Sequence, residues 1–244
     1  GVGHEGGAAL ARARAQHRAA SRRGAHRAAR LISKWIDTGE DALLEWQSDE
    51  IVDDLVVRRD SQLSFKAYQL KNSPRVSWTG GDPSIEDDFK DQQRIAVASG
   101  YTDIRVRLVC SDSQTASGLS KAVPPSIVGC ARALHFPYDT SAHRLLDGSD
   151  WLKKDFAAVS RYAAATAVEA SYVAVVLAGA LAELYPKAWI SEIYSQARTM
   201  RPELLRSTRT EADALAQLDP QFRDLLNNLP GFNYSVVRGF LHRY

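Results

Sequence analysis

Two neighbouring strand-like segments carry polar side chains whose types and spacing suit metal-assisted chemistry. The first, over residues 50–57, contains two adjacent aspartates, and the second, over residues 65–71, ends in Gln69-Leu70-Lys71. Because side chains alternate between the faces of a strand, those of Gln69 and Lys71 point to the same side. The short turn between the segments predicts a hairpin. An acidic side chain would then lie near an amide and an ammonium group, an arrangement that can hold a divalent cation.

The chemistry that such a site could support is phosphodiester hydrolysis. This reaction needs a nucleophilic water, stabilisation of the charge that develops on the phosphate, and help for the departing oxygen. Bound Mg²⁺ or Mn²⁺ can polarise the phosphate and lower the pKa of a bound water, and one or two protein carboxylates suffice to hold such a cation. Lys71 could orient or deprotonate the attacking water, or stabilise the phosphate charge.

The residues alone leave the set of metal ligands open. Asp53 and Asp54 face opposite sides of a strand, so only one of them can share a site with Gln69. The amide oxygen of Gln69 can bind a metal but contributes no negative charge. Glu45 on the preceding strand, or Glu40 just before it, could supply a second carboxylate.

The elements that must position these residues follow the order helix, three strands, helix, strand. Hydrophobic spacing and turn residues predict a helix over 8–37, strands over 42–46, 50–58 and 63–72, a helix over 85–99 and a strand over 104–110. The second half is mostly helical in its pattern, with helices predicted over 151–162, 163–185, 188–199 and 211–226, and a short strand or docked tail over 231–237.

These residues resemble the PD-(D/E)XK, or restriction-endonuclease-like, nuclease superfamily. Its core pattern is an Asp followed by hydrophobic residues on one strand and (Glu/Asp/Gln)-x-Lys on the next, and the match here is Asp54-Leu55-Val56-Val57 with Gln69-Leu70-Lys71. The surrounding sequence is similar to that of the N-terminal nuclease domains of bacterial anti-phage effectors such as those of CBASS systems. The similar segments, within residues 25–115, are Asp-Asp-Leu-Val-Val, Tyr-Gln-Leu-Lys, Ser77-Trp78-Thr79, and Asp88-Phe89 with Gln92.

The resemblance implies an α/β fold, with a restriction-endonuclease-like mixed sheet flanked by helices. The nuclease core would span residues 1–150, and residues 151–244 would form a helical extension packed on it. The resemblance favours Asp54 over Asp53, so that Asp54, Gln69 and Lys71 are the expected catalytic residues. Asp54, Gln69 and Glu45 are the expected ligands of Mg²⁺ or Mn²⁺.

The same resemblance implies a metal-dependent endonuclease that cuts double-stranded DNA as an effector of bacterial defence. Its activity would be restrained until a fused or associated sensor domain, or an oligomeric assembly, releases it. We expect a homo-oligomer, because cutting both strands of a duplex needs two sites. Two other functions stay open: a catalytically inactive nuclease-like domain that binds nucleic acid, and a helical protein-interaction module with a purely structural strand pair.

Composition narrows these functions only slightly. The net charge of +2 does not mark a nucleic-acid binder, although the first 30 residues hold seven arginines against Glu5. That segment could neutralise phosphates or could be a solvated lead segment.

Two cysteines make neither a disulfide framework nor a zinc motif, which favours a reducing cytoplasm. Residues 162–185 are long and apolar enough to span a bilayer, but their alanines and two glutamates favour a buried helix, so we expect no membrane partner.

Overall fold

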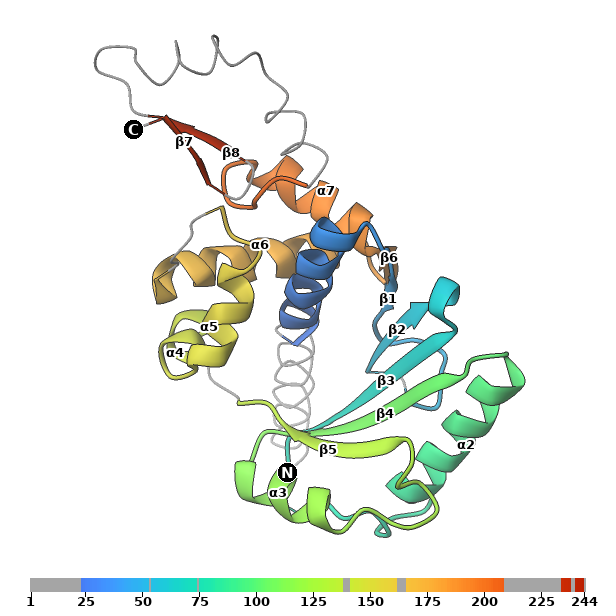
Figure 1. Ribbon diagram of the computed structural model, residues 1–244. Helices are drawn as coiled ribbons and strands as arrows, with labels where there is room; N and C mark the ends of the chain where they lie inside the picture. The colour runs from blue at the N-terminus through green and yellow to red at the C-terminus, as the bar shows by residue number, and fades with distance from the viewer. Residues whose placement is uncertain are drawn as a thin grey trace, which may run out of the picture. The chain divides into compact units, whose positions relative to one another are not determined.

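The computed structural model describes residues 23–52, 54–73, 75–137, 141–161 and 166–208, with the backbone of residues 234–237 and 240–243 (Figure 1). The described residues group into two compact units. The first draws on residues within 1–24, 41–140 and 181–189, and the second on residues within 25–40, 141–180 and 190–244. The predicted boundary between core and extension at residue 150 stays a prediction.

The first unit is built on a six-stranded mixed sheet with the strand order β5-β4-β3-β2-β1-β6. Strands β3, β4 and β5 are parallel, and the remaining neighbours pair antiparallel. The sheet flanked by helices confirms the predicted α/β class (Figure 1). The strands are β1 (Leu43–Glu45), β2 (Leu55–Arg59), β3 (Ser64–Lys71), β4 (Asp103–Cys110), β5 (Ala131–His135) and β6 (Lys187–Trp189).

The predicted hairpin is present, since β2 pairs antiparallel with β3 through a short 3-10 turn, η1 (Asp60–Gln62). Leu63 closes the turn in the left-handed region, with φ of 45°. The predicted start of the second strand at residue 50 is wrong, because β2 begins only at Leu55. Polar contacts of Glu50 and Val52 with neighbouring elements hold the preceding residues in a loop instead.

Helix α2 (Ile85–Ala98) forms where the sequence predicted it. The hydroxyl of Ser84 caps it by accepting a hydrogen bond from the Asp87 N–H at 3.1 Å. Its buried residues recur every three or four positions, as expected for a helix with one face on a sheet. They are Ile85, Phe89, Gln92 and Ala96.

A hydrophobic core lies between α2 and the sheet. Phe65 of β3 and Leu108 of β4 are fully buried in it together with Phe89. The ring of Trp78 packs against Phe89, with the ring centroids 5.7 Å apart. Its indole N–H donates to the Leu119 carbonyl at 3.0 Å, so Trp78 is a core residue.

Helix α3 (Ser113–Lys121) and strand β5, which complete the first unit, were not predicted from the sequence. Strand β6 was not predicted either, because the helix predicted over 188–199 covered its residues 188 and 189. In the structure β6 pairs with β1, and α7 begins at Ile190.

Most of the described elements of the second unit are helices. This unit contains most of the helix over residues 23–38, together with α4 (Ala142–Asp147), α5 (Asp150–Ala157), most of α6 (Ala167–Glu183) and α7 (Ile190–Met200). Long-range polar contacts join these segments: His26 Nε2 lies 2.7 Å from Asp155 Oδ2, and Arg206 Nη2 donates to Asp37 Oδ1 at 2.9 Å.

Near the C-terminus, β7 (Tyr234–Val237) and β8 (Phe240–Arg243) form a separate antiparallel pair. Strand β7 overlaps the strand or tail predicted over residues 231–237. The helix predicted over 211–226 and the start of the first predicted helix lie outside the described residues. In the part of the chain that is described, no helix is both long and apolar enough to cross a membrane.

Truncating Phe89 tests the core beneath α2. We expect Phe89→Ala to lower the free energy of opening this unit by about 3–5 kcal/mol, because the substitution removes a fully buried ring and leaves a cavity. Amide hydrogen exchange in β3 and β4 measures that free energy. The control is Val97→Ala on the exposed side of the same helix, where Val97 is 58% exposed, and it should change stability by less than about 0.5 kcal/mol. Equal effects of the two variants would contradict the packing described here.

Candidate active site

The end of β3 and the loop before β2 bring three of the predicted site residues together. The last paired positions of the hairpin at this end are Leu55 and Tyr68. Just beyond them, the N–H of Leu70 donates to Oδ2 of Asp54 at 2.6 Å. This bond holds the Asp54 carboxylate beside the strand end that carries Gln69 and Lys71. Its rival, Asp53, lies outside the described residues.

Gln69 presents a buried oxygen that has no protein partner. The residue is 8% exposed, and its Oε1 is buried without a hydrogen bond in the structure. A buried acceptor that loses its hydrogen bond costs about 1–3 kcal/mol, so folded proteins seldom leave one unsatisfied. An amide oxygen in this position is suited to accept a bond from a ligand.

Asp88 joins this site from the first turn of α2. Its carboxylate is half-buried, accepts a side-chain hydrogen bond from Gln69 and feels the charge of Lys71. Burial, the largest effect, raises the pKa of Asp88, and the opposing effects of Lys71 and Gln69 do not offset it. Asp88 was not predicted as a site residue. Its position directly before the buried Phe89 places it at the border of the face that α2 turns to the sheet, a signal present in the sequence.

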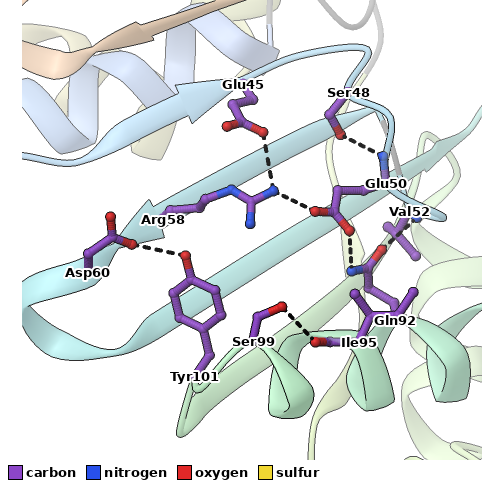
Figure 2. A network of polar contacts seen from close by, with 10 residues as sticks. All are labelled: Glu45, Ser48, Glu50, Val52, Arg58, Asp60, Gln92, Ile95, Ser99 and Tyr101. Atoms are coloured by element: carbon purple, nitrogen blue, oxygen red, sulfur yellow. Dashed lines mark hydrogen bonds and ion pairs between the residues drawn. The ribbon is translucent and has the colours of Figure 1, made fainter.

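A buried polar network fixes the loop that leads to Asp54 (Figure 2). Gln92 of α2 is fully buried, and its Oε1 accepts from the Val52 N–H at 3.0 Å. Its Nε2 donates to Oε2 of Glu50 at 2.8 Å, and Arg58 Nη2 donates to Oε1 of Glu50 at 2.5 Å. Gln92 thus satisfies a backbone N–H of this loop and holds the segment that leads to Asp54.

Strand β2 lies between Glu45 and β3 in the sheet. Glu45 lies opposite Val56 in the sheet, and its Oε2 accepts from Arg58 Nη2 at 3.3 Å (Figure 2). Glu45 thus shares the guanidinium of Arg58 with Glu50. Its predicted role as a metal ligand stays a prediction. The other carboxylate considered, Glu40, accepts from Lys34 Nζ at 2.5 Å.

The residues at the end of β3 fit Mg²⁺ or Mn²⁺ by their donor set. Among the described residues, no group of three or more His, Cys, Asp or Glu side chains is placed to hold a metal. A cation here would therefore use the oxygen atoms of a carboxylate and an amide, with waters completing its shell, as Mg²⁺ commonly does. The unpartnered Oε1 of Gln69 is the observation that favours this use.

Acid titration tests the Glu50 network. Burial acts to raise the pKa of Glu50, but the hydrogen bonds from Gln92 and Arg58 and the Arg58 charge outweigh it, so the net pKa is lowered. A carboxyl whose pKa is lower in the folded state stabilises the fold above its unfolded pKa of about 4.3, and that stability is lost as the pH falls through the folded pKa. We expect the stability difference between wild type and Glu50→Gln to shrink between about pH 5 and pH 3.

Urea unfolding followed by circular dichroism at several pH values measures this difference. The matched control is Asp49→Asn, because Asp49 is the exposed neighbour of Glu50 and has no part in the network. Its stability should follow that of the wild type at every pH. A stability difference for Glu50→Gln that stays constant from pH 6 to pH 3 would contradict the network's role.

Comparisons with protein-family models, with curated proteins and with solved structures found no match to this chain. What the site does must therefore be inferred from its own side chains. Those side chains are a held carboxylate, a buried amide oxygen, a lysine and a second carboxylate on α2.

Proposed function

We propose that this site is the catalytic centre of a metal-dependent endonuclease that hydrolyses phosphodiester bonds of double-stranded DNA. The observation that carries the proposal is the unpartnered, buried Oε1 of Gln69, which lies at the same strand end as Asp54 and Lys71. An amide oxygen, a carboxylate and an ammonium group at one strand end suit a divalent cation and a phosphate together.

Asp54 and Gln69 would hold Mg²⁺ or Mn²⁺. The bound cation would polarise the phosphate and supply a water of lowered pKa. Lys71 is half-buried at the end of β3, on the same side of the strand as Gln69. From there its ammonium group donates hydrogen bonds to a phosphate oxygen or to the attacking water, which stabilises the charge of the transition state. The Asp54–Leu70 hydrogen bond keeps the carboxylate fixed during these steps.

The biological setting is proposed from the sequence resemblance. The motif Asp54-Leu55-Val56-Val57 with Gln69-Leu70-Lys71 is similar to that of nuclease domains in bacterial anti-phage effectors. We accordingly propose a cytoplasmic defence effector that acts as a homo-oligomer and is released by a fused or associated sensor domain. The order helix, three strands, helix, strand in the described residues supports the same proposal.

Plasmid cleavage tests the proposed activity. We expect supercoiled DNA to be nicked and linearised with Mg²⁺ or Mn²⁺ but not with chelator, and more efficiently at protein concentrations that favour oligomers. Lys71→Ala should lower the rate by about 10²–10⁴-fold, because it removes the group that assists proton transfer or charge stabilisation. Asp54→Asn should lower the rate at least about 100-fold, since loss of a metal ligand costs no less than loss of an outer-shell partner.

Two exposed residues serve as matched controls for these substitutions. Lys121→Ala at the end of α3 and Asp91→Asn on α2 should cleave at the wild-type rate. Cleavage that survives both Asp54→Asn and Lys71→Ala would remove these residues from the reaction. A wild type that cuts nothing at any concentration would favour the second function below.

A row of basic side chains favours the second candidate function, binding of nucleic acid without cleavage. On the sheet face opposite α2, Lys66 is level with Arg105, and Tyr68 is level with Arg107 and Arg132. Among the described strand residues of this face, Asp103 is the one acidic residue, and its carboxylate forms an ion pair with Arg105 at 2.8 Å. Burial lowers the pKa of Arg107, and the like charges of Arg105 and Arg132 lower it further. Such a cluster of like charges is suited to a phosphate backbone.

Salt dependence of DNA binding tests this surface separately from cleavage. In chelator, anisotropy of a labelled duplex should show weaker binding by the double variant Arg105→Ala/Arg132→Ala. The slope of log K against log salt should become shallower by about 2, since each lost phosphate contact removes about 0.9. The control is Arg94→Ala on α2, which is 76% exposed and should keep the wild-type slope. If the wild type binds DNA with no salt dependence, the third function, a protein-interaction module, is favoured.

A further inference from the structure

The proposed metal site has a shortage of negative charge. Of the two ligands assigned to it, Asp54 brings one carboxylate, whereas Gln69 is neutral. Glu45, the carboxylate expected to make up the difference, hydrogen-bonds to Arg58 instead. A divalent cation held by a single carboxylate and an amide would bind weakly, because ligand charge contributes strongly to the affinity for hard cations.

The carboxylate of Asp88 contacts the side chain of Gln69. The Gln69 side chain donates a hydrogen bond to Asp88, so one end of the amide is engaged by the carboxylate while the other end, Oε1, is buried and unpartnered. An amide held in this way has its oxygen orientation set by the carboxylate. Gln69 therefore links Asp88 to the strand end that Asp54 contacts.

The backbone around Asp88 is rigid, which suits a ligand-bearing position. The Ser84 cap fixes the first turn of α2, and Phe89, the next residue, is fully buried against Trp78. Asp88 lies between these two anchors and is itself half-buried. Groups that are held by packing keep the geometry that a metal site needs.

The charged side chains that act on Asp88 are mostly acidic. Its neighbours on α2, Asp87 and Asp91, are both acidic, and Lys71 is the cation whose charge it feels most. Lys90, on the same helix, lies 2.8 Å from Glu86 and 3.6 Å from Asp87 instead. A half-buried carboxylate next to two acids is stabilised by a divalent cation more than by one partly exposed lysine.

We propose that Asp88 is the second carboxylate of the metal site and supplies the charge that Gln69 lacks. The inference rests on the proposed function, since it assigns a further ligand to the same cation. In it, Asp54, Gln69 Oε1 and Asp88 together hold one Mg²⁺ or Mn²⁺. Asp88 also orients the Gln69 amide before the cation binds.

Calorimetric titration of the full chain with Mn²⁺ tests this inference by binding rather than by activity. Asp88→Asn keeps an acceptor for the Gln69 amide but removes the charge, and we expect it to weaken Mn²⁺ binding at least about tenfold. The matched control is Asp91→Asn, which lies three residues further along α2, is exposed, and pairs with Arg94 at 3.1 Å. Its Mn²⁺ affinity should stay within about twofold of the wild type, because it lies outside the site.

A compensating double variant, Gln69→Glu/Asp88→Asn, tests whether charge is what Asp88 contributes. It moves the carboxylate from α2 to β3, and we expect it to recover most of the affinity that Asp88→Asn loses. Failure to recover, or wild-type affinity in Asp88→Asn alone, would overturn the role of Asp88 while leaving Mn²⁺ binding by the wild type as support for the proposed function. No Mn²⁺ binding by the wild type would overturn both. The circular dichroism spectrum of each variant checks that the fold is intact.

Discussion

The structure of this site depends on one buried amide. Gln92 sits on the sheet-facing side of α2 with no exposed surface, and its two polar atoms reach the loop that precedes β2. A buried glutamine is costly unless both ends are bonded, and here the Val52 N–H and the Glu50 carboxylate satisfy them. Because the loop is held this way, the chain enters β2 with Asp54 against the end of β3. Asp88 lies on the same helix as Gln92, about one turn before it.

The two faces of the sheet differ in their charged residues, although both bury apolar side chains. One face carries Phe65, Ala67 and Leu108 beneath α2, and it ends in the polar residues of the site. The other carries the basic row of β3, β4 and β5. This division follows from the alternation of side chains along a strand, because successive residues of β3 serve opposite faces. A single strand thus contributes both Gln69 and Lys71 on one face and Lys66 of the basic row on the other.

The neutral Gln69 changes the electrostatics of the site more than its packing. An acidic residue in its place would bring a second charge from β3 itself, next to Asp54. With an amide there, a metal site would need its second charge from another element, and the proposed source is the half-buried carboxylate of Asp88 on α2. Burial raises the pKa of that carboxyl.

The sequence by itself determined the elements whose patterns are local. The hairpin, α2 with its Ser84 cap, and β4 follow from side-chain alternation, helical spacing and capping, all of which operate between residues close along the chain. So does the shared side of Gln69 and Lys71, which needs only the period of a strand. The short strands β5 and β6 escaped the prediction because a few residues carry too little pattern, and pairing with other strands stabilises them.

Only the tertiary structure decided which side chains each carboxylate meets. Glu45, predicted as a metal ligand, hydrogen-bonds to Arg58, and that contact depends on strand register. Asp88 is 19 positions from Gln69 and on a different kind of element, so no spacing rule joins them. Their contact exists because α2 packs its Phe89 side onto the sheet, which is a consequence of core packing between residues far apart in the sequence.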